Sequence, residues 1–410
     1  MNTSRRGLLL GGVALASAGA GALAGYVTAP EQTTSVPSDQ VPFFGARQAG
    51  IATPAQQRLA FAAYDVVAGG RPALQELLKT WTAAAAAMCQ GRMVPGDSTT
   101  PAAPPADTGE AVGLPAANLT ITIGFGPSLF DGRFGLSGRR PAALADLPRF
   151  PRDQLDPNNS GGDLCIQACS DDPVVAFHAI RNLARLGRGT VTMRWSQLGF
   201  GTASSSGAVP DTPRNLMGFK DGTRNIETVD DALMNQHVWV GDDTDQAWMK
   251  GGSYLVSRRI RMKIEAWDRD YLSDQEAVFG RQKMTGAPLG GAKEHDDPDF
   301  AAKDPGTGEP VIAVDAHMRL AAHENNDGLR ILRRGYSYTD GMFSDSGELD
   351  AGLFFIAFQR DPRTQFVPLQ RKLSASDALN EYIEHVGSGL YACPPGAPSS
   401  GDYWGSALFA

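Results

Sequence analysis

The chain has 410 residues, of which 42% are hydrophobic and 20% charged, a composition typical of globular proteins and not of disordered, collagen-like or coiled-coil proteins. Its 47 glycines and 27 prolines argue against an all-helical bundle and favour an α+β or all-β enzyme with long, ordered loops. The formal charge is −8 and no basic run lies outside the N-terminus, so nucleic acid is not an expected partner.

Residues 1–29 are predicted to be a targeting segment that is not part of the fold. They contain Ser4-Arg5-Arg6-Gly7 and then an apolar run to about Tyr26, which is the pattern of a twin-arginine export signal. The alternative is a membrane anchor, but the run is only weakly hydrophobic. Because the twin-arginine translocase carries folded proteins, we expect this protein to acquire a cofactor or partner in the cytoplasm. It would then work outside the cytoplasmic membrane, extracellularly or on the periplasmic side of the cell envelope.

After a polar linker over residues 30–50, an N-terminal half is predicted over residues 51–215. Its elements are a strand, a helix, two strands, a helix capped by Asp171 or Asp172, and a strand, at 57–67, 73–89, 119–125, 164–168, 173–186 and 190–198. This β-α-β-β-α-β order is that of a ferredoxin-like unit.

The same order returns in a C-terminal half over residues 216–410. The predicted strand, helix, two strands, helix and strand lie at 253–266, 271–279, 330–338, 352–358, 373–386 and 390–393. We therefore predict an α+β fold in which two ferredoxin-like halves pack sheet against sheet with the helices outside. Long insertions at 93–117, 201–215 and 281–312 are candidates for lids or access walls.

The histidines and cysteines lack the spacings of a zinc site. His178 and His385 are predicted to lie in helices as packing or dipole-compensating residues, and His295 lies in a solvated loop. His317 or His323, which precede a predicted strand, is a candidate for a lone axial ligand of haem iron. Cys165 and Cys169 are four apart along a strand, which favours buried free thiols over a disulfide.

Residues 218–225 (GFKDGTRN) form the most informative local motif. Glycines on both sides of the Phe-Lys-Asp triplet allow a sharp loop that projects Asp221 into a cavity at the junction of the two halves. Taken alone, the motif is also compatible with an ordinary Asp-Gly turn. Three later segments and the C-terminus add context: residues 316–320 (AHMRL), 332–338 (LRRGYSY), 352–360 (GLFFIAFQR) and 401–405 (GDYWG).

Together these segments resemble dye-decolourising peroxidases from about residue 50 to the C-terminus, and the predicted export signal suits the exported bacterial subgroup that includes deferrochelatases. The resemblance implies a haem b protein with a dimeric α+β barrel fold, which agrees with the duplicated element order. It also implies that hydrogen peroxide and a reducing substrate are the reactants.

A haem peroxidase needs a proton shuttle and a fixed cation beside the peroxide. Asp221 is the candidate shuttle and Arg333, the first arginine of Arg-Arg-Gly-Tyr, is the candidate distal cation. Strand alternation then leaves Arg334 on the opposite face, as a structural or propionate-pairing residue. His317 matches the family's proximal ligand, and His323 is the alternative.

The proximal histidine needs a hydrogen-bond acceptor, for which Glu381 on the last predicted helix is the first choice and Asp377 the second. Leu353 and Phe355 are expected to cover the distal side of the haem, with Phe354 pointing away. Aromatic residues that could relay electrons from bulky substrates, or simply pack, are Trp239, Trp248, Tyr336, Tyr338 and Trp404.

Three functions fit these patterns. The first is a haem peroxidase. The second is a haem-binding protein whose main role is iron or haem handling. The third is a non-haem binding module of the export pathway, which would show no Soret absorption. Self-association into a homo-oligomer is also compatible with the sequence, since no motif excludes it.

Overall fold

A computed structural model describes residues 39–67, 69–202 and 212–410. The predicted signal segment 1–29, linker residues 30–38 and most of the predicted insertion at 201–215 lie outside these ranges. No helix within the described ranges combines the length and the apolar character that a membrane span requires.

The N-terminal half contains the six elements expected from the sequence. In chain order they are β1 Arg58–Val66, α1 Gly70–Met88, β2 Thr120–Phe125, β3 Leu164–Ser170, α2 Pro173–Leu186 and β4 Val191–Thr202. Helix α2 begins where the sequence predicts because the Asp172 carboxylate accepts hydrogen bonds from the backbone N–H of Val174 and Val175, with Pro173 in the first turn.

The C-terminal half carries more short helices than expected. Its principal elements are α3 Asp231–His237, β5 Ser253–Met262, α4 Ile264–Trp267, α5 Leu272–Phe279, α6 His317–Ala321, β6 Leu332–Arg333, β7 Tyr336–Met342, β8 Leu349–Gln359, α7 Phe366–Ser376 and β9 Ile383–Cys393. The strand predicted at 330–338 is thus two strands, β6 and β7, and the strand predicted at 253–266 ends at Met262 before a helical turn.

The predicted helix at 373–386 is wrong. Helix α7 starts seven residues earlier and ends at Ser376, because the Asp377 side chain accepts a hydrogen bond from the Leu379 N–H and starts a separate 3-10 turn, Ala378–Glu381. The chain then enters strand β9 at Ile383. His385 is therefore a strand residue and not the helical packing residue that the sequence suggested.

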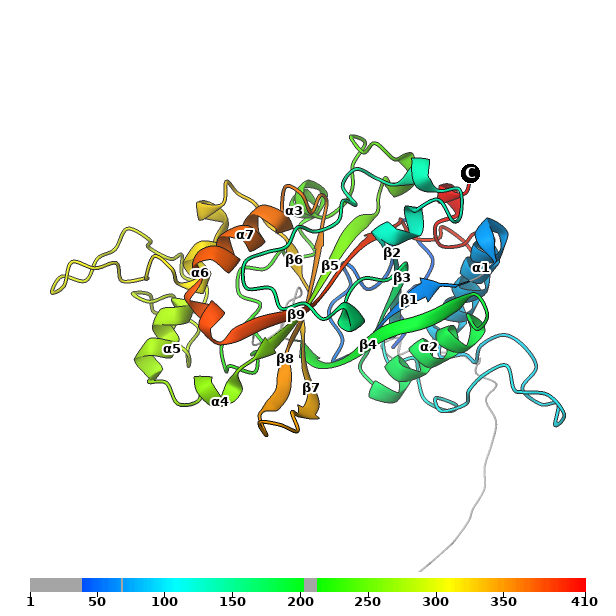
Figure 1. Ribbon diagram of the computed structural model, residues 1–410, viewed down its shortest axis with the longest axis horizontal. Coiled ribbons are helices and arrows are strands. Elements are labelled where there is room, and N and C mark those ends of the chain that lie inside the picture. Colours follow the sequence, from blue (N-terminus) through cyan, green and yellow to red (C-terminus); the bar gives the residue numbers. More distant parts are fainter. Residues whose placement is uncertain (1–38, 68, 203–211) are drawn as a thin grey trace, which may run out of the picture. The chain divides into compact units, whose positions relative to one another are not determined.

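The described strands form one antiparallel barrel (Figure 1). The order is β5-β9-β2-β3-β1-β4-β7-β8, and pairing of β8 with β5 closes the ring, while the short β6 adds to β8. Each half keeps the ferredoxin-like order, β2-β3-β1-β4 and β9-β5-β8-β7. The predicted α+β barrel is confirmed, and the two sheets that face each other are also joined at their edges through β2–β9 and β4–β7.

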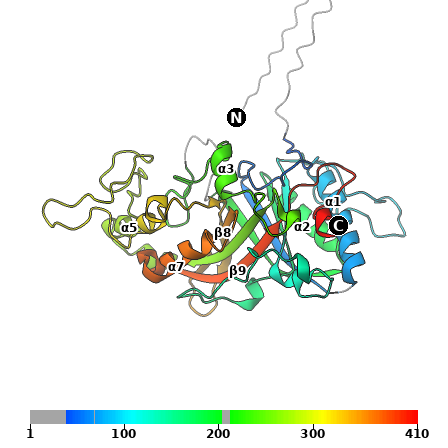
Figure 2. The same ribbon diagram turned by 90° about the horizontal axis from the view of Figure 1, so that it is seen from above.

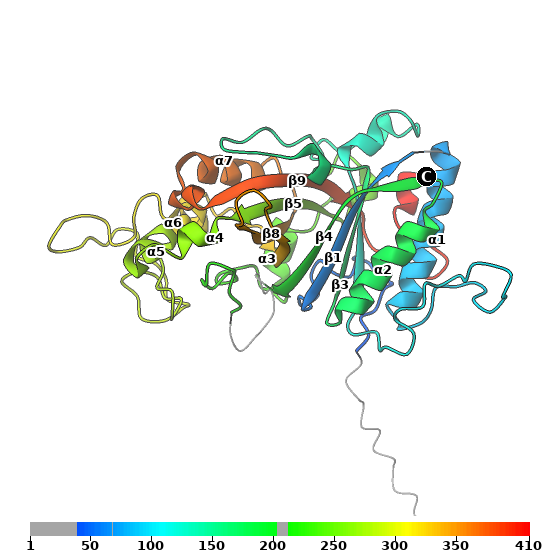
Figure 3. The same ribbon diagram turned by 60° about the horizontal axis from the view of Figure 1, so that its bottom comes forward.

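The barrel interior is an apolar core drawn from both halves, and the helices lie outside it. Phe61, Trp195, Phe354 and Tyr391 pack there, with Phe61 and Trp195 stacked at a ring-centroid distance of 5.2 Å. Helices α1 and α2 lie side by side over the outer face of the N-terminal sheet (Figure 3). Helices α4 to α7 gather beside the C-terminal sheet (Figures 1 and 2).

Candidate active site

A cavity opens on the outer face of the C-terminal sheet. Residues of strands β5, β8 and β9 line its floor, and residues of α6, α7 and the segment 215–226 line its walls. Because side chains alternate along a strand, the residues of β8 that border the cavity, Leu353 and Phe355, alternate with residues buried in the barrel core. The lining is mostly apolar, and its aliphatic and aromatic part includes Met217, Ile226, Ile260, Met262, Phe279, Leu329, Phe366, Leu369 and Leu379.

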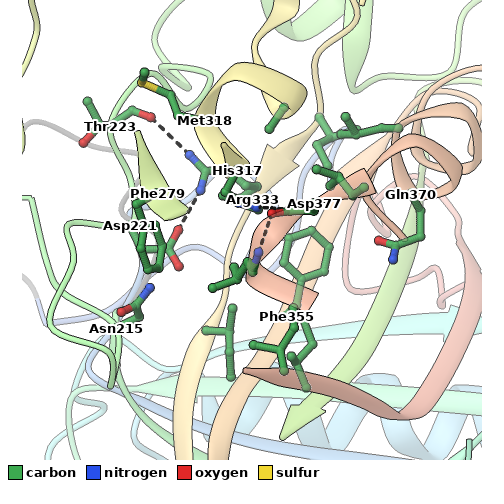
Figure 4. Close-up of a pocket in the computed structure, with 18 of the residues that line it drawn as sticks. Asn215, Asp221, Thr223, Phe279, His317, Met318, Arg333, Phe355, Gln370 and Asp377 are labelled. Atoms are coloured by element: carbon green, nitrogen blue, oxygen red, sulfur yellow. Dashed lines mark hydrogen bonds and ion pairs between the residues drawn. The ribbon is translucent and has the colours of Figure 1, made fainter. Parts of the chain in front are cut away.

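One imidazole faces this cavity from the start of helix α6. His317 Nδ1 lies 2.6 Å from Asp377 Oδ2, whose side chain is only 3% exposed (Figure 4). Burial of the ring by itself lowers the pKa of His317, but the Asp377 carboxylate outweighs it and the pKa is raised. The His317 side chain retains 35% exposure because it borders the cavity. With Nδ1 held by the carboxylate, Nε2 is the nitrogen available to a ligand.

Asp377, and not Glu381, is therefore the acceptor for His317. The predicted helix through residue 386 contains both candidates, and the structure does not contain that helix. Because the chain turns at Asp377, this carboxylate both caps the 3-10 turn through Oδ1 and meets His317 through Oδ2. Glu381 ends that turn and does not border the cavity.

A second charged pair borders the same cavity. Arg333 Nη1 donates to Asp221 Oδ1 at 2.6 Å, and Arg333 Nη2 donates to the carbonyl of Thr223 at 3.2 Å (Figure 4). The side chains of Asp221 and Arg333 are 15% and 26% exposed, so the pair is largely shielded from bulk solvent yet reachable from the cavity. The 218–225 motif and the Arg-Arg-Gly-Tyr segment are thus brought together across more than a hundred residues of sequence.

Arg334 does not take part in this cavity. It is 1% exposed and donates to the carbonyl of Thr53 and, at 2.7 Å, to Gln56 Oε1. The predicted opposite orientation of Arg333 and Arg334 is present. Arg334 does not border the cavity and bonds to the segment before β1, which favours the structural alternative over the propionate-pairing one.

Leu353 and Phe355 both border the cavity, and Phe354 lies in the barrel core against Phe61 and Trp195, as the strand alternation predicted.

A buried arginine and histidine also border the cavity. The Arg258 guanidinium lies beside Asp153 and donates to His385 Nδ1 at 3.2 Å. Burial and the neighbouring Arg258 lower the pKa of His385 to about 3, so this imidazole is neutral at physiological pH.

Basic side chains that sequence reasoning did not single out also border the cavity. The Arg224 guanidinium pairs with Glu324, and its Nη2 lies 3.2 Å from His323 Nε2. The pKa of His323 is lowered, first by burial of the ring and second by the positive charge of Arg330. Burial lowers the pKa of Arg281 to about 10, which leaves it charged at neutral pH. No sequence pattern marked this group, because its members come from three separate loops.

The candidate relay residues are all buried. Tyr336 and Tyr338 lie in the barrel core, and none of the remaining three, Trp239, Trp248 and Trp404, is more than 8% exposed. Cys165 and Cys169 are free thiols on strand β3, so no disulfide joins them.

The residues present fit a haem. An iron porphyrin needs an apolar slot, one strong axial donor and cations for its carboxylate groups. The cavity supplies an aliphatic and aromatic lining, the His317 Nε2 atom with its Nδ1 anchored to a carboxylate, and Arg224 and Arg330 at the rim. A carboxylate behind the ligating histidine is the arrangement that fixes the tautomer and raises ligand basicity.

Comparisons with known proteins agree with this geometry. The family model described as Dyp-type peroxidase, N-terminal matches residues 48–201, and the model Dyp-type peroxidase, C-terminal matches residues 212–398. A deferrochelatase of Escherichia coli (strain UTI89 / UPEC) is 41% identical, with 99% of this chain and 96% of the relative covered. For the deferrochelatase of Escherichia coli (strain K12), the identity is also 41%, with coverages of 95% and 94%.

Solved structures show the same likeness. Ferric DtpA from Streptomyces lividans has a TM-score of 0.84 and 42% identity, with 92% of this chain and 99% of that chain covered. A DyP-type peroxidase from Cellulomonas bogoriensis has a TM-score of 0.81 and 39% identity, with coverages of 90% and 98%.

Proposed function

This chain belongs to the Dyp-type peroxidase family and is a haem peroxidase, and from that premise we propose that it binds haem b in the cavity of the C-terminal half. There it reduces hydrogen peroxide to water at the expense of dyes, phenols or other one-electron donors. The observation that supports this site is that one cavity is bordered both by a carboxylate-held imidazole and by a separate guanidinium–carboxylate pair.

In this proposal His317 is the residue that would hold the haem iron. Its Nδ1–H donates to Asp377, so Nε2 carries a lone pair directed away from the carboxylate. Asp377 is itself held by the Leu379 N–H, which limits its freedom to move away from the imidazole. The pair thus holds the ring in one tautomer and one orientation.

Asp221 and Arg333 act on the peroxide in this proposal, Asp221 by proton transfer and Arg333 by its positive charge. A bound haem would supply the redox-active iron whose electrons reduce the peroxide O–O bond. Asp221, the carboxylate of an ion pair, accepts a proton from one peroxide oxygen and returns it to the other, which leaves as water. Arg333 stays protonated and presents a fixed positive charge to the negative charge that develops as the bond breaks.

The remaining wall residues set the environment. Leu353 and Phe355 exclude water from the peroxide side, which strengthens the electrostatic contribution of Arg333. Arg224 and Arg330 are the proposed partners of the haem carboxylates, in place of Arg334.

The test is optical. Haem-free protein titrated with hemin is expected to develop a Soret band at one haem per chain, and one equivalent of hydrogen peroxide is expected to change that band within the mixing time. The control is Asn182→Ala, which alters a buried amide in the N-terminal half without touching the cavity. Failure to take up hemin would refute the proposal.

Iron release is a second candidate, favoured by the 41% identity to proteins named deferrochelatase across nearly the whole chain. In this alternative the same cavity holds the porphyrin while its iron departs. Holoprotein incubated anaerobically with a reductant and an Fe²⁺ chelator would then yield free iron and the fluorescence of metal-free porphyrin. Peroxide-dependent oxidation of a dye with the porphyrin intact supports the peroxidase instead.

We also propose that the protein is exported by the twin-arginine translocase, on the basis of Arg5 and Arg6 and the apolar run behind them. Replacement of both by lysine is expected to retain the protein in the cytoplasm, whereas the unchanged chain is recovered outside the cytoplasmic membrane. Equal distribution of both forms would contradict the proposal.

A further inference from the structure

Arg333 occupies an unusual place in the sheet. It lies on β6, a strand of two residues that, among the described strands, pairs with β8 alone and stands at the end of the strand order. Arg334 donates its N–H to the Ile356 carbonyl at 2.7 Å. In an antiparallel pair such bonds are made by alternate residues, so the N–H and carbonyl of Arg333 point away from β8, towards a side on which the described part of the chain places no strand.

The side chain of Asn225 fills this position. Its Nδ2 donates to the Arg333 carbonyl at 2.8 Å, and its Oδ1 accepts from the Arg333 N–H at 3.0 Å. A carboxamide carries the same donor and acceptor as a peptide group. Asn225 thus pairs with both backbone groups of Arg333 as a neighbouring strand would.

The same short loop also holds the other end of Arg333. The Asp221 carboxylate and the Thr223 carbonyl accept hydrogen bonds from the Arg333 guanidinium, while Asn225 bonds to the Arg333 backbone. Arg224, between Thr223 and Asn225, has a φ of 61°, in the left-handed region that non-glycine residues seldom adopt. This turn allows the Thr223 carbonyl and the Asn225 side chain to face Arg333 together.

We propose that Asn225 is a positioning residue for Arg333: its carboxamide fixes the backbone of a two-residue edge strand and thereby sets where the guanidinium meets Asp221 and the peroxide. The inference rests on the proposed role of Arg333 in peroxide cleavage. It assigns Asn225 no direct contact with substrate or haem, because Asn225 does not border the cavity.

The chemistry of the position requires asparagine. Alanine removes both hydrogen bonds and leaves two backbone groups of an edge strand without their partner. Aspartate has the same size and still accepts from the Arg333 N–H, but it cannot donate, and it sets a carboxylate oxygen against the Arg333 carbonyl. The Asn225→Ala and Asn225→Asp variants therefore separate hydrogen bonding from packing.

The deciding experiment is a double-mutant cycle on the haem-loaded protein. The rate at which hydrogen peroxide changes the Soret band is measured for wild type, Asn225→Ala, Arg333→Leu and the double variant, and the affinity of the ferric protein for fluoride serves as a readout independent of turnover. A misplaced catalytic group costs on the order of 10²-fold for about 1 Å. We expect Asn225→Ala to slow the reaction about 10- to 100-fold and to weaken fluoride binding, since a bound anion also uses the distal hydrogen-bond donor.

In the Arg333→Leu background, Asn225→Ala is expected to change neither quantity by more than about twofold, because residues that act as a unit are not additive. Independent, multiplicative losses would overturn the inference. So would a wild-type rate in Asn225→Asp, which would show that volume alone matters there.

The outcomes also distinguish this inference from the function on which it rests. If Arg333→Leu leaves the peroxide rate unchanged, the proposed role of Arg333 fails first. If Arg333→Leu is slow while Asn225→Ala and Asn225→Asp match wild type, only the positioning role fails. Asn182, a buried amide on α2 that donates to Thr108 Oγ1 at 2.8 Å, provides the matched control. Asn182→Ala is expected to lower thermal stability while leaving the peroxide rate and fluoride affinity unchanged.

Discussion

Replacement of Asp377 by asparagine tests the proximal half of the site with almost no change in shape. Asp377 has two tasks, since Oδ1 caps the Leu379 N–H at 2.9 Å and Oδ2 meets His317 Nδ1 at 2.6 Å. Asparagine has only one acceptor oxygen. If that oxygen keeps the cap, the NH₂ group faces His317 Nδ1, which must then accept, and the ring proton moves to Nε2.

A proton on Nε2 occupies the position that the iron requires. The opposite rotamer restores an acceptor to His317 but loses the cap, at about 1 kcal/mol of stability. In either case the carboxylate that raises the His317 pKa is gone. Loss of such a carboxylate behind a ligating histidine costs about 10- to 100-fold in affinity, which corresponds to about 1.4–2.7 kcal/mol.

Titration of the haem-free variant with hemin, followed at the Soret band, measures this loss. Glu381→Gln is the matched control, because it makes the same chemical change four residues away on a side chain that does not border the cavity. We expect weaker hemin binding in Asp377→Asn and none of that loss in Glu381→Gln. The reverse result would refute the assignment of Asp377.

Further variants probe the other parts of the site. His317→Ala is expected to abolish or severely weaken hemin binding, and full haem occupancy with an unchanged Soret band would move the assignment to His323. Arg333→Leu and Asp221→Ala are expected to retain haem and slow the Soret change by about 10²–10³-fold and 10²–10⁴-fold respectively; stopped-flow rates near wild type in both would show that peroxide reacts elsewhere. Arg334→Met is expected to lower the melting temperature without altering hemin affinity, since its guanidinium contacts residues before β1 and not the cavity; weaker hemin binding at unchanged stability would contradict this. Burial tends to raise the pKa of Glu294, but hydrogen bonds from Lys220, Thr212 and Thr223 lower this pKa to about 2. The ionised Glu294 therefore stabilises the fold fully above pH 4.5, the ordinary pKa of a glutamate, and this stabilisation is lost as the pH falls towards 2. Urea unfolding should therefore show wild type more stable than Glu294→Gln at pH 6, with the difference vanishing across that window.

Much of the N-terminal half was predictable because its signals are local. Asp172 and Pro173 mark the start of α2, and the buried strands stand between loops rich in Gly and Pro. Local signals of this kind persist in the folded protein where tertiary packing favours the same local conformation. His317, Asp221 and Arg333 are candidates through the family resemblance of their segments, and the structure brings all three to one cavity.

The errors share a different cause. Residues 373–386 contain enough helix-favouring side chains to suggest one long helix, but Asp377 ends it by bonding to its own backbone two residues on. The predicted helix contains both Asp377 and Glu381, and only the turn that begins at Asp377 shows which carboxylate reaches His317. The hydrogen-bond partners of Arg334 lie some 280 residues away in sequence, so no local pattern could reveal that its guanidinium bonds to the segment before β1. The two hydrogen bonds from Asn225 to the Arg333 backbone were equally hidden, although Asn225 lies within the motif itself.

The two strand pairs that join the halves of the barrel affect how the chain folds as it is synthesised. The two sheets meet at β2–β9, where Phe125 faces Ala392, and at β4–β7, where Phe200 faces Ser337. A half released from its partner would present two open strand edges and a bare apolar inner face, a combination that promotes aggregation. Because β9 pairs with both β5 and β2, the ring cannot close until residues 383–393 have been synthesised. A chain truncated before residue 383 would lack β9 and could not form the closed barrel.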